Sequence, residues 1–133
     1  MALARSIVAA YAARGLDPAP ALAQAQITPA RLREPLGRIT ARQMEVLSGA
    51  AMQALDDEGL GVFRRRLPWG TYGMLARASL SAPNLGLALR RWCRHHRLVT
   101  DDISLHLEVA GAQARLRIDE HTDLGAQREF RSE

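Results

Sequence analysis

Histidine and cysteine side chains are the residues of this sequence that could bind a metal ion. Cys93, His95 and His96 are neighbours in a segment of helical pattern, and His106 and His121 follow along the chain. A two-histidine site on a helix needs ligands four residues apart, whereas adjacent positions diverge by about 100 degrees. The spacing favours a structural role, with His96 packed beside Trp92. We expect no metal and no cofactor, and the single cysteine excludes an internal disulfide.

Aromatic and polar side chains near a predicted apolar helix are the best candidates for a ligand pocket. Ligand pockets are mostly apolar with a few polar groups that fix orientation, and an arginine fork matches a carboxylate. Aromatic residues also fill cores, and an arginine is commonly exposed, so the structural interpretations stay open. The candidate effector-pocket residues are Trp69, Tyr72, Arg77, Trp92 and His96.

Arginine supplies the whole positive charge, because all 18 basic residues are arginine and the formal net charge is +4. Arg90, Arg94 and Arg97 share one helical face and could follow nucleic-acid phosphates, although a solvated helix face needs no partner. Residues 21–33 imitate a helix-turn-helix, but Pro35 makes the second helix too short to present several residues to base edges. A small stand-alone arginine-rich nucleic-acid-binding protein is therefore the alternative function.

No motif in the sequence predicts catalysis. We find no nucleophile elbow, phosphate loop, paired-carboxylate motif or metal spacing. The acids Asp56, Asp57 and Glu58 cluster at a predicted helix end. They are either solvated or paired with the arginines at 64–66. We expect no catalytic residues and no enzyme.

Helical signals dominate the first hundred residues. We expect a helix over 2–14, two short helices begun by Asp17-Pro18 and Thr28-Pro29, and a longer one that starts with a Thr40 and Gln43 capping box and ends at Gly59. The segment 71–80 is apolar around most of its circumference, which predicts a buried helix. The break at residues 81–84 starts one more helix.

The periodicity changes to two residues from Ile103 onward. It predicts a hairpin with strands 102–109 and 112–118, Gly111 in the turn and one buried face, followed by a loop from Asp119. An isolated hairpin is only marginally stable, so this one must lie on the helices, extend a larger sheet or be covered by a paired chain. The expected fold class is α+β, mostly helical, with a small antiparallel sheet packed on helices.

Length and composition predict one ordinary globular domain. The chain has 133 residues, 47% hydrophobic and 24% charged, which suits a single core. No apolar run approaches the roughly 18 to 20 residues of a membrane helix, and no export signal is present. We therefore expect a cytoplasmic protein that does not act on a membrane.

Four segments in order resemble the N-terminal, arabinose-binding-like domain of AraC-type bacterial transcription regulators. The resemblance implies a domain that senses a small effector or pairs two subunits, with a homodimer as the expected assembly. It also implies that 1–133 is a truncated N-terminal domain, and that DNA is bound only by a C-terminal helix-turn-helix domain absent from this chain. The effector would sit between residues 69–80 and the hairpin. The matching segments are 12–18, 60–62, 70–75 and, most specifically, Leu80-Ser81-Ala82-Pro83-Asn84-Leu85-Gly86-Leu87-Ala88-Leu89.

Overall fold

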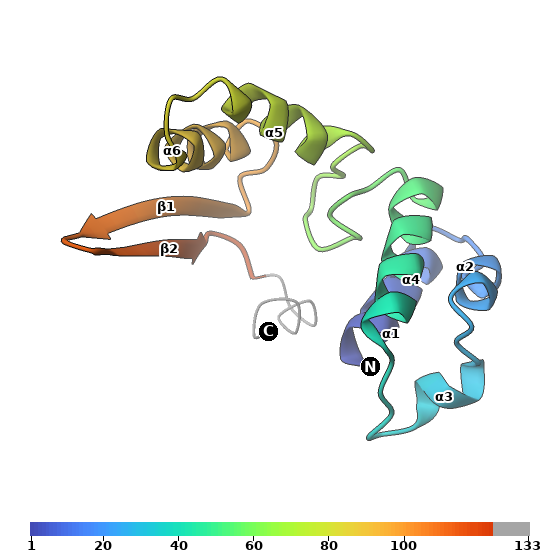
Figure 1. Ribbon diagram of the computed structural model, residues 1–133. Coiled ribbons are helices and arrows are strands. Elements are labelled where there is room, and N and C mark those ends of the chain that lie inside the picture. Colours follow the sequence, from blue (N-terminus) through green and yellow to red (C-terminus); the bar gives the residue numbers. More distant parts are fainter. Residues whose placement is uncertain (124–133) are drawn as a thin grey trace.

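The computed structural model describes residues 1–123 and shows two groups of elements joined by the loop at 55–70 (Figure 1). The first group holds α1 (Ala2–Ala13), α2 (Ala19–Gln24), α3 (Pro29–Arg33) and α4 (Ala41–Ala54). The second holds α5 (Thr71–Leu80), α6 (Leu85–His96), β1 (Ile103–Ala110) and β2 (Gln113–Glu120). The fold is α+β and mostly helical with one antiparallel pair of strands, as predicted.

Side-chain caps start α3 and α4 where the sequence predicts them. Thr28 accepts a hydrogen bond from the Arg31 N–H at 3.2 Å, and Thr40 and Gln43 form the reciprocal capping box of α4. The predicted cap of α2 is off by one residue, because Pro18 is its N-cap and Asp17 accepts from the Ala19 N–H at 2.9 Å from outside the helix. These contacts are local in sequence, which is why spacing alone can find them.

The largest cluster of buried apolar side chains belongs to α1, α2 and α4 and the turns that follow them. Ile7 of α1 and Leu47 of α4 are fully buried, and Leu22 and Ile27 close the cluster from the α2 side. Leu60, in the connecting loop, is the last residue of this cluster. The first group therefore has a core of its own, to which the loop is attached.

The helix α4 ends at Ala54, and the prediction that it continues to Gly59 is wrong. Asp56 adopts the left-handed conformation at φ 46°, and the Asp57 N–H closes the helix by donating to the Met52 carbonyl at 2.9 Å. The helix ends here because the Asp57 carboxylate accepts hydrogen bonds from backbone N–H groups of the loop that follows.

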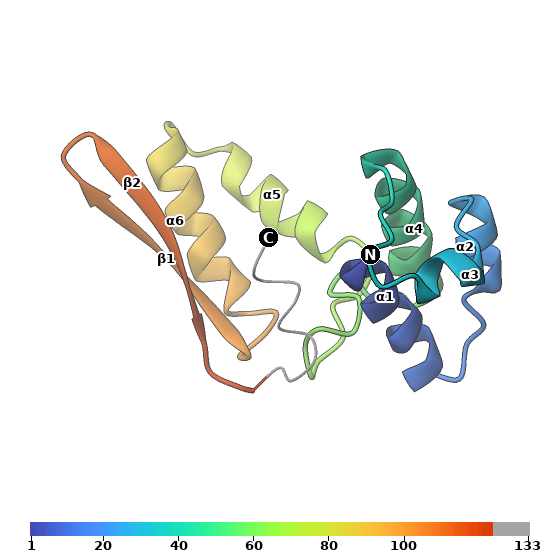
Figure 2. The same ribbon diagram turned by 90° about the horizontal axis from the view of Figure 1, so that it is seen from below.

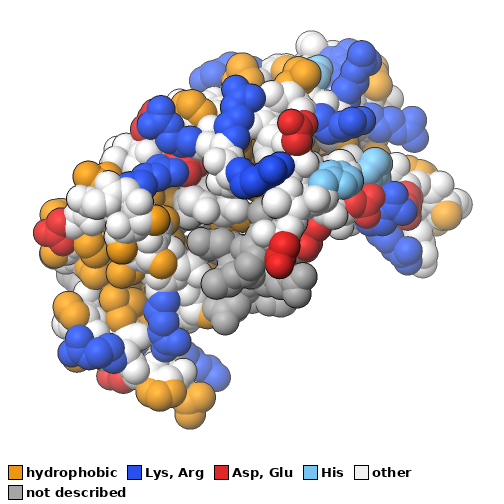
Figure 3. Space-filling view, turned by 180° about the vertical axis from the view of Figure 1, so that it is seen from behind, with side chains coloured by type: hydrophobic (Ala, Val, Ile, Leu, Met, Phe, Trp, Pro, Cys, Tyr) orange, Lys and Arg blue, Asp and Glu red, His pale blue; other side chains and the backbone are white. Residues whose placement is uncertain are grey.

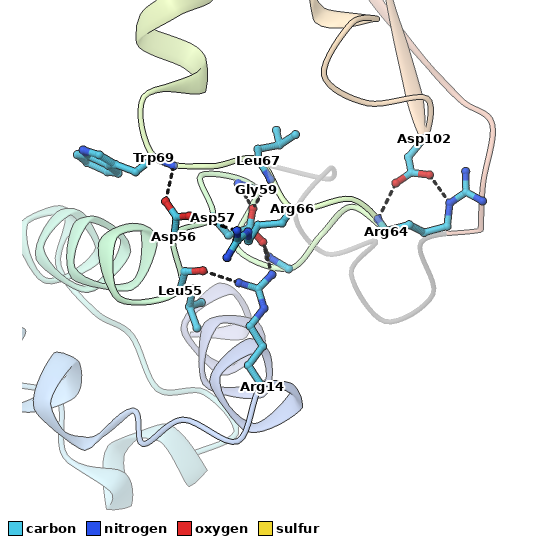
Figure 4. A network of polar contacts seen from close by, with 11 residues as sticks. Arg14, Leu55, Asp56, Asp57, Gly59, Arg64, Arg66, Leu67, Trp69 and Asp102 are labelled. Carbon is cyan, nitrogen blue, oxygen red and sulfur yellow. Dashed lines mark hydrogen bonds and ion pairs between the residues drawn. The ribbon is translucent and has the colours of Figure 1, made fainter.

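The Asp57 carboxylate is buried and accepts four hydrogen bonds (Figure 4). The N–H groups of Gly59 and Leu67 donate to Oδ1 at 2.9 and 3.0 Å, and the Gly61 N–H donates to Oδ2 at 3.0 Å. Arg14 donates to Oδ2 at 2.6 Å and, through its other terminal nitrogen, to the Leu55 carbonyl at 2.8 Å. A buried carboxylate is tolerated only when it is paired and hydrogen-bonded, and this one meets both conditions.

The loop can approach α1 closely because residue 61 is a glycine. Gly61 has a φ of +79°, and a Cβ built there would lie 3.0 Å from the Cβ of Ala10. A side chain at this position would therefore combine an unfavourable backbone conformation with a collision against α1.

The neighbouring acids attach the same loop to the second group. Glu58 accepts from the N–H groups of Gly70 and Tyr72 at 2.8 and 2.6 Å, so a remote carboxylate caps the first turn of α5. Asp56 accepts from the Trp69 N–H at 2.9 Å and pairs with Arg66 at 3.4 Å. Pairing with the arginines at 64–66 is therefore confirmed for Asp56 alone, because Asp57 pairs with Arg14 and Glu58 accepts from backbone N–H groups.

In the second group, α6 lies between α5 and the hairpin, and both pack against it (Figure 2). The prediction that α5 is buried is wrong. Only Leu75 and Ser79 of this helix are buried, whereas Met74 is exposed and Leu80 is 80% exposed. Among the described residues α5 packs closely against one element, α6, which covers a single face of it.

Both strands of the hairpin start one residue later than predicted, and β2 continues to Glu120, which pairs with Ile103. Gly111 lies in the turn at φ +58°, where a left-handed conformation is required. The expected buried face is only half covered, since Leu105 is buried but Leu116 and Ile118 are about half exposed. Residues 119 and 120 belong to β2, and 124–133 of the predicted loop lie outside the described residues.

The replacement Asp57→Asn tests whether this carboxylate holds the two groups together. An amide offers one accepting oxygen and would turn its NH2 group toward backbone donors, leaving buried N–H groups and Arg14 without a carboxylate. We expect the free energy of unfolding, measured in urea, to fall by about 2 to 4 kcal/mol.

Glu45→Gln is the matched control, because Glu45 pairs with Arg42 on the exposed face of α4. It should leave the unfolding curve nearly unchanged. Equal effects of the two replacements would contradict the role given to Asp57.

Candidate functional site

Three of the five predicted pocket residues come together between α5 and α6. The rings of Tyr72 and Trp92 are stacked, with centroids 5.8 Å apart and planes inclined by 9°. The imidazole of His96 lies 6.0 Å from the Tyr72 ring. Trp92 and His96 are four residues apart and therefore share one face of α6. We call Tyr72, Trp92 and His96 the aromatic cluster.

His96 is the polar centre of the aromatic cluster. Its side chain is only 3% exposed, and its Nδ1 atom has no hydrogen-bond partner among the described residues. Burial lowers the pKa of His96, which favours the neutral imidazole. A neutral ring carries one donor and one acceptor nitrogen, so the cluster combines stacking surfaces with an unsatisfied polar group.

Tyr72 keeps its phenol proton in this environment. Burial raises its pKa, and the nearby carboxylates of Glu58 and Asp57 raise it further. The hydroxyl is therefore a neutral donor, and Glu58 also fixes the Tyr72 backbone through the cap on α5. Glu58 thus fixes the position of this residue and adds to the effect of burial on its pKa.

Trp69 and Arg77 do not join the aromatic cluster. Trp69 is half exposed, and Figure 4 shows its side chain directed away from the polar network of the loop. Arg77 is exposed on α5. The two residues flank Tyr72 in the sequence, but the structure shows no ring contact between either of them and the cluster. The predicted pocket is therefore brought together only in part.

Phe63 is a residue of this region that sequence reasoning missed. Its ring meets His96 edge to face, with centroids 6.3 Å apart and planes inclined by 74°. Phe63 lies in the loop, 33 residues before its partner in the numbering. No local periodicity marks such a contact, because it depends on how the loop folds around Asp57.

The other histidine and cysteine residues, for which the sequence predicted no metal site, lie on the hairpin, directly after it or on α6. His106 and His121 both contact the Ser104 hydroxyl, at 3.0 and 2.8 Å. Cys93 is buried, and burial raises the pKa of its thiol. Within residues 1–123 no group of three or more His, Cys, Asp or Glu side chains is arranged to hold a metal ion.

Two surface grooves lie outside the aromatic cluster. One, of about 240 Å³, is lined by Arg64, Arg97 and Asp102 together with neighbouring residues of both segments. Desolvation would raise the pKa of Asp102, but hydrogen bonds from Arg64 and Thr122 outweigh it and hold the pKa low. The other groove, of about 610 Å³, is apolar and lies over α1, α2 and α3, where Figure 3 shows hydrophobic side chains gathered.

On the face that Figure 3 shows, the arginines of residues 1–123 are dispersed and are not gathered into one patch. Arg90, Arg94 and Arg97 are all exposed, in agreement with a solvated helix face. Figure 3 shows basic side chains spread from the four-helix group to the hairpin on this face. The helix α3 has five residues and ends at Arg33, too short for a recognition helix. These features give little support to the nucleic-acid alternative.

The described residues contain no helix that is long and apolar enough to cross a membrane.

Comparison with known proteins identifies one family. The family model for the arabinose-binding domain of AraC transcription regulators, N-terminal, matches residues 15–133. The chain is also similar to the ornithine utilization regulator of Pseudomonas aeruginosa, with 31% identity over 110 residues. That match covers 82% of this chain and 32% of the relative, so the chain spans about a third of the relative's length.

The buried His96 predicts a pH-dependent stability. Its pKa is lowered from 6.5 in the folded chain, so the unfolded chain binds this proton more readily. The contribution of His96 is present above pH 6.5 and is lost as the pH falls toward the lowered value. We expect the melting temperature to drop between pH 7.5 and 5.5.

His96→Gln should make this drop shallower, because it removes the titrating group. Arg94→Gln, at an exposed position of α6, serves as the control and should retain the wild-type slope. The same slope in wild type and His96→Gln would show that another group causes the pH dependence.

Proposed function

The chain belongs to the AraC transcription regulators, of which it carries the N-terminal arabinose-binding domain, and we propose that this domain senses a small effector and pairs two regulator subunits. The family consists of transcription regulators, so the chain is part of a transcription factor and not an enzyme. The observation that carries the sensing role is the buried His96 with an unsatisfied nitrogen among aromatic rings.

The proposed effector site is centred on the aromatic cluster. Buried polar atoms in native proteins nearly always have a partner, so the Nδ1 atom of His96 is suited to bind a polar group of the effector. Tyr72 and Trp92 supply stacking surfaces. Trp69 and Arg77 stay predictions from sequence, because both are exposed and Arg77 lies about two residues around α5 from the buried Leu75, on the face away from α6.

The aromatic rings and the unsatisfied imidazole nitrogen favour a small polar metabolite. The relative is named for ornithine and the family for arabinose. We include both compounds among the candidates, together with other amino acids and sugars.

The regulatory output is proposed to pass through α6. This helix carries Trp92 and His96 on the α5 side and packs against β1 of the hairpin. Because α6 fills the space between α5 and the hairpin, an effector in this region would contact α6 itself. A ligand that prefers one packing of α6 would shift the balance between two states of the domain.

DNA binding is proposed to reside in a part of the full-length regulator outside these residues, and the protein to act in the cytoplasm. The short α3 and the dispersed arginines offer no recognition surface of their own. Pairing of two copies would place two DNA-binding domains on the two half-sites of an operator.

A thermal-shift screen of this chain against amino acids, including ornithine, and sugars, including arabinose, tests the sensing role. A ligand at a hundredfold its dissociation constant stabilises the folded state by about 2.7 kcal/mol, so a true effector should raise the melting temperature by several degrees. A cooperative melt that no compound shifts would contradict effector sensing by this chain.

Variants then locate the site. His96→Gln and Tyr72→Ala should reduce the ligand-induced shift, since both residues belong to the aromatic cluster. Arg94→Gln is the control, because Arg94 is exposed on α6 and makes none of the ring contacts. Equal shifts in all variants would place the effector elsewhere in the domain.

A further inference from the structure

The strand β2 forms an open edge of the sheet. Within residues 1–123 the sheet has two strands, β1 pairs with β2, and β1 packs against α6. The side of β2 away from β1 therefore pairs with no strand of the described chain. An open edge offers N–H and C=O groups to another strand, and proteins usually cover or block it.

The hairpin register shows which residues offer these groups. The two-residue turn at 111–112 joins Ala110 to Gln113, which are paired. Pairs that flank such a turn are hydrogen-bonded, and hydrogen-bonded and non-hydrogen-bonded pairs alternate along an antiparallel ladder. The backbone groups of Ala114, Leu116 and Ile118 therefore point outward, away from β1.

The side chains of these residues lie on an apolar face of the sheet that is buried at Leu105 of β1 and about half exposed at Leu116 and Ile118 of β2. Leu107 pairs with Leu116 and Leu105 with Ile118, so the four side chains share one face of the sheet. Leu105 is buried, whereas Leu116 and Ile118 are 51% and 52% exposed. An apolar strip and an open edge thus coincide on β2.

We propose that β2 pairs antiparallel with β2 of a second copy of this chain and forms a four-stranded sheet across a two-fold axis. This inference rests on the proposed pairing role and assigns its surface. With Arg117 at the axis, Leu116 lies opposite Ile118 of the second copy, and Arg115 lies opposite Asp119 of the second copy. Both contacts occur twice because of the symmetry.

Charge and apolar matching together favour this register over its neighbours. With Leu116 opposite itself, Arg115 would face Arg117, and like charges directly opposite are destabilising. With Ile118 opposite itself, Arg117 would face Asp119 of the second copy, but Leu116 would face the acidic Glu120 and the contact between Leu116 and Ile118 would be lost. In the proposed register the two copies of Arg117 meet, but each is neutralised by Glu108 and Asp119 of its own chain, at 3.0 and 3.1 Å.

Disulfide trapping tests the register directly. Arg117→Cys, in a Cys93→Ser background, would place two cysteines opposite each other in a non-hydrogen-bonded pair. The Cα atoms of such a pair lie about 4.5 Å apart, which a disulfide can bridge. We expect rapid formation of a covalent dimer under mild oxidation, seen on non-reducing gels.

Arg115→Cys in the same background is the matched control. It lies on the same strand and face, but the two copies of residue 115 would be about 13 Å apart, too far for a disulfide. Equal trapping of both variants, or none of Arg117→Cys, would overturn the proposed register.

A change of charge tests the same contact without a covalent bond. Arg115→Asp should weaken dimerisation about tenfold, measured by light scattering over a concentration series, because two carboxylates would then face each other twice. Arg115→Gln should weaken it less, because it removes the attraction to Asp119 of the second copy without adding a repulsion. Circular dichroism melts confirm that each variant is folded.

The outcomes separate this inference from the proposed function. A dimer that persists without trapping and without a charge effect overturns the β2 interface and leaves pairing intact. A chain that stays monomeric throughout overturns pairing as well. Effector sensing is decided by the thermal-shift screen and depends on neither result.

Discussion

The buried Asp57 carboxylate is the interaction on which the rest of this structure depends. Its four hydrogen bonds join α1, through Arg14, to a loop that starts at the end of α4 and runs to Leu67. A carboxylate in this position carries a large desolvation penalty, so the loop must keep the shape that supplies every donor. That shape fixes where α5 begins and therefore how the second group of elements joins the first.

The two neighbouring acids extend this constraint to the candidate site. Glu58 caps α5 at the N–H groups of Gly70 and Tyr72, which sets the position of the Tyr72 ring against Trp92. The same loop brings Phe63 against His96. A run of three acids that looks like a solvated helix end thus determines the geometry of an aromatic cluster in another part of the fold.

The sequence predicted what depends on local contacts. Thr28, the Thr40 and Gln43 pair and the alternation from Ile103 each act within a few residues, so the elements that they start were found. The end of α4 and the exposure of Leu80 could not be found in this way, because both depend on which segments meet in space. For the candidate site, helical spacing predicted that Trp92 and His96 lie together. The contact of Phe63 with His96 and the position of Trp69 outside the cluster depend on the fold of the loop, so local spacing could not predict them.

The position of α6 links the two proposals for this domain. On one side it carries Trp92 and His96 to the Tyr72 ring, and on the other it packs against β1. Protein interiors are close-packed, so a shift of this helix is transmitted to its neighbours. An effector that binds His96 and moves α6 would therefore change the support under β1, and with it the orientation of the β2 edge. Sensing and pairing would be coupled through one helix, with the free energy of coupling set by the difference in effector affinity between its two packings.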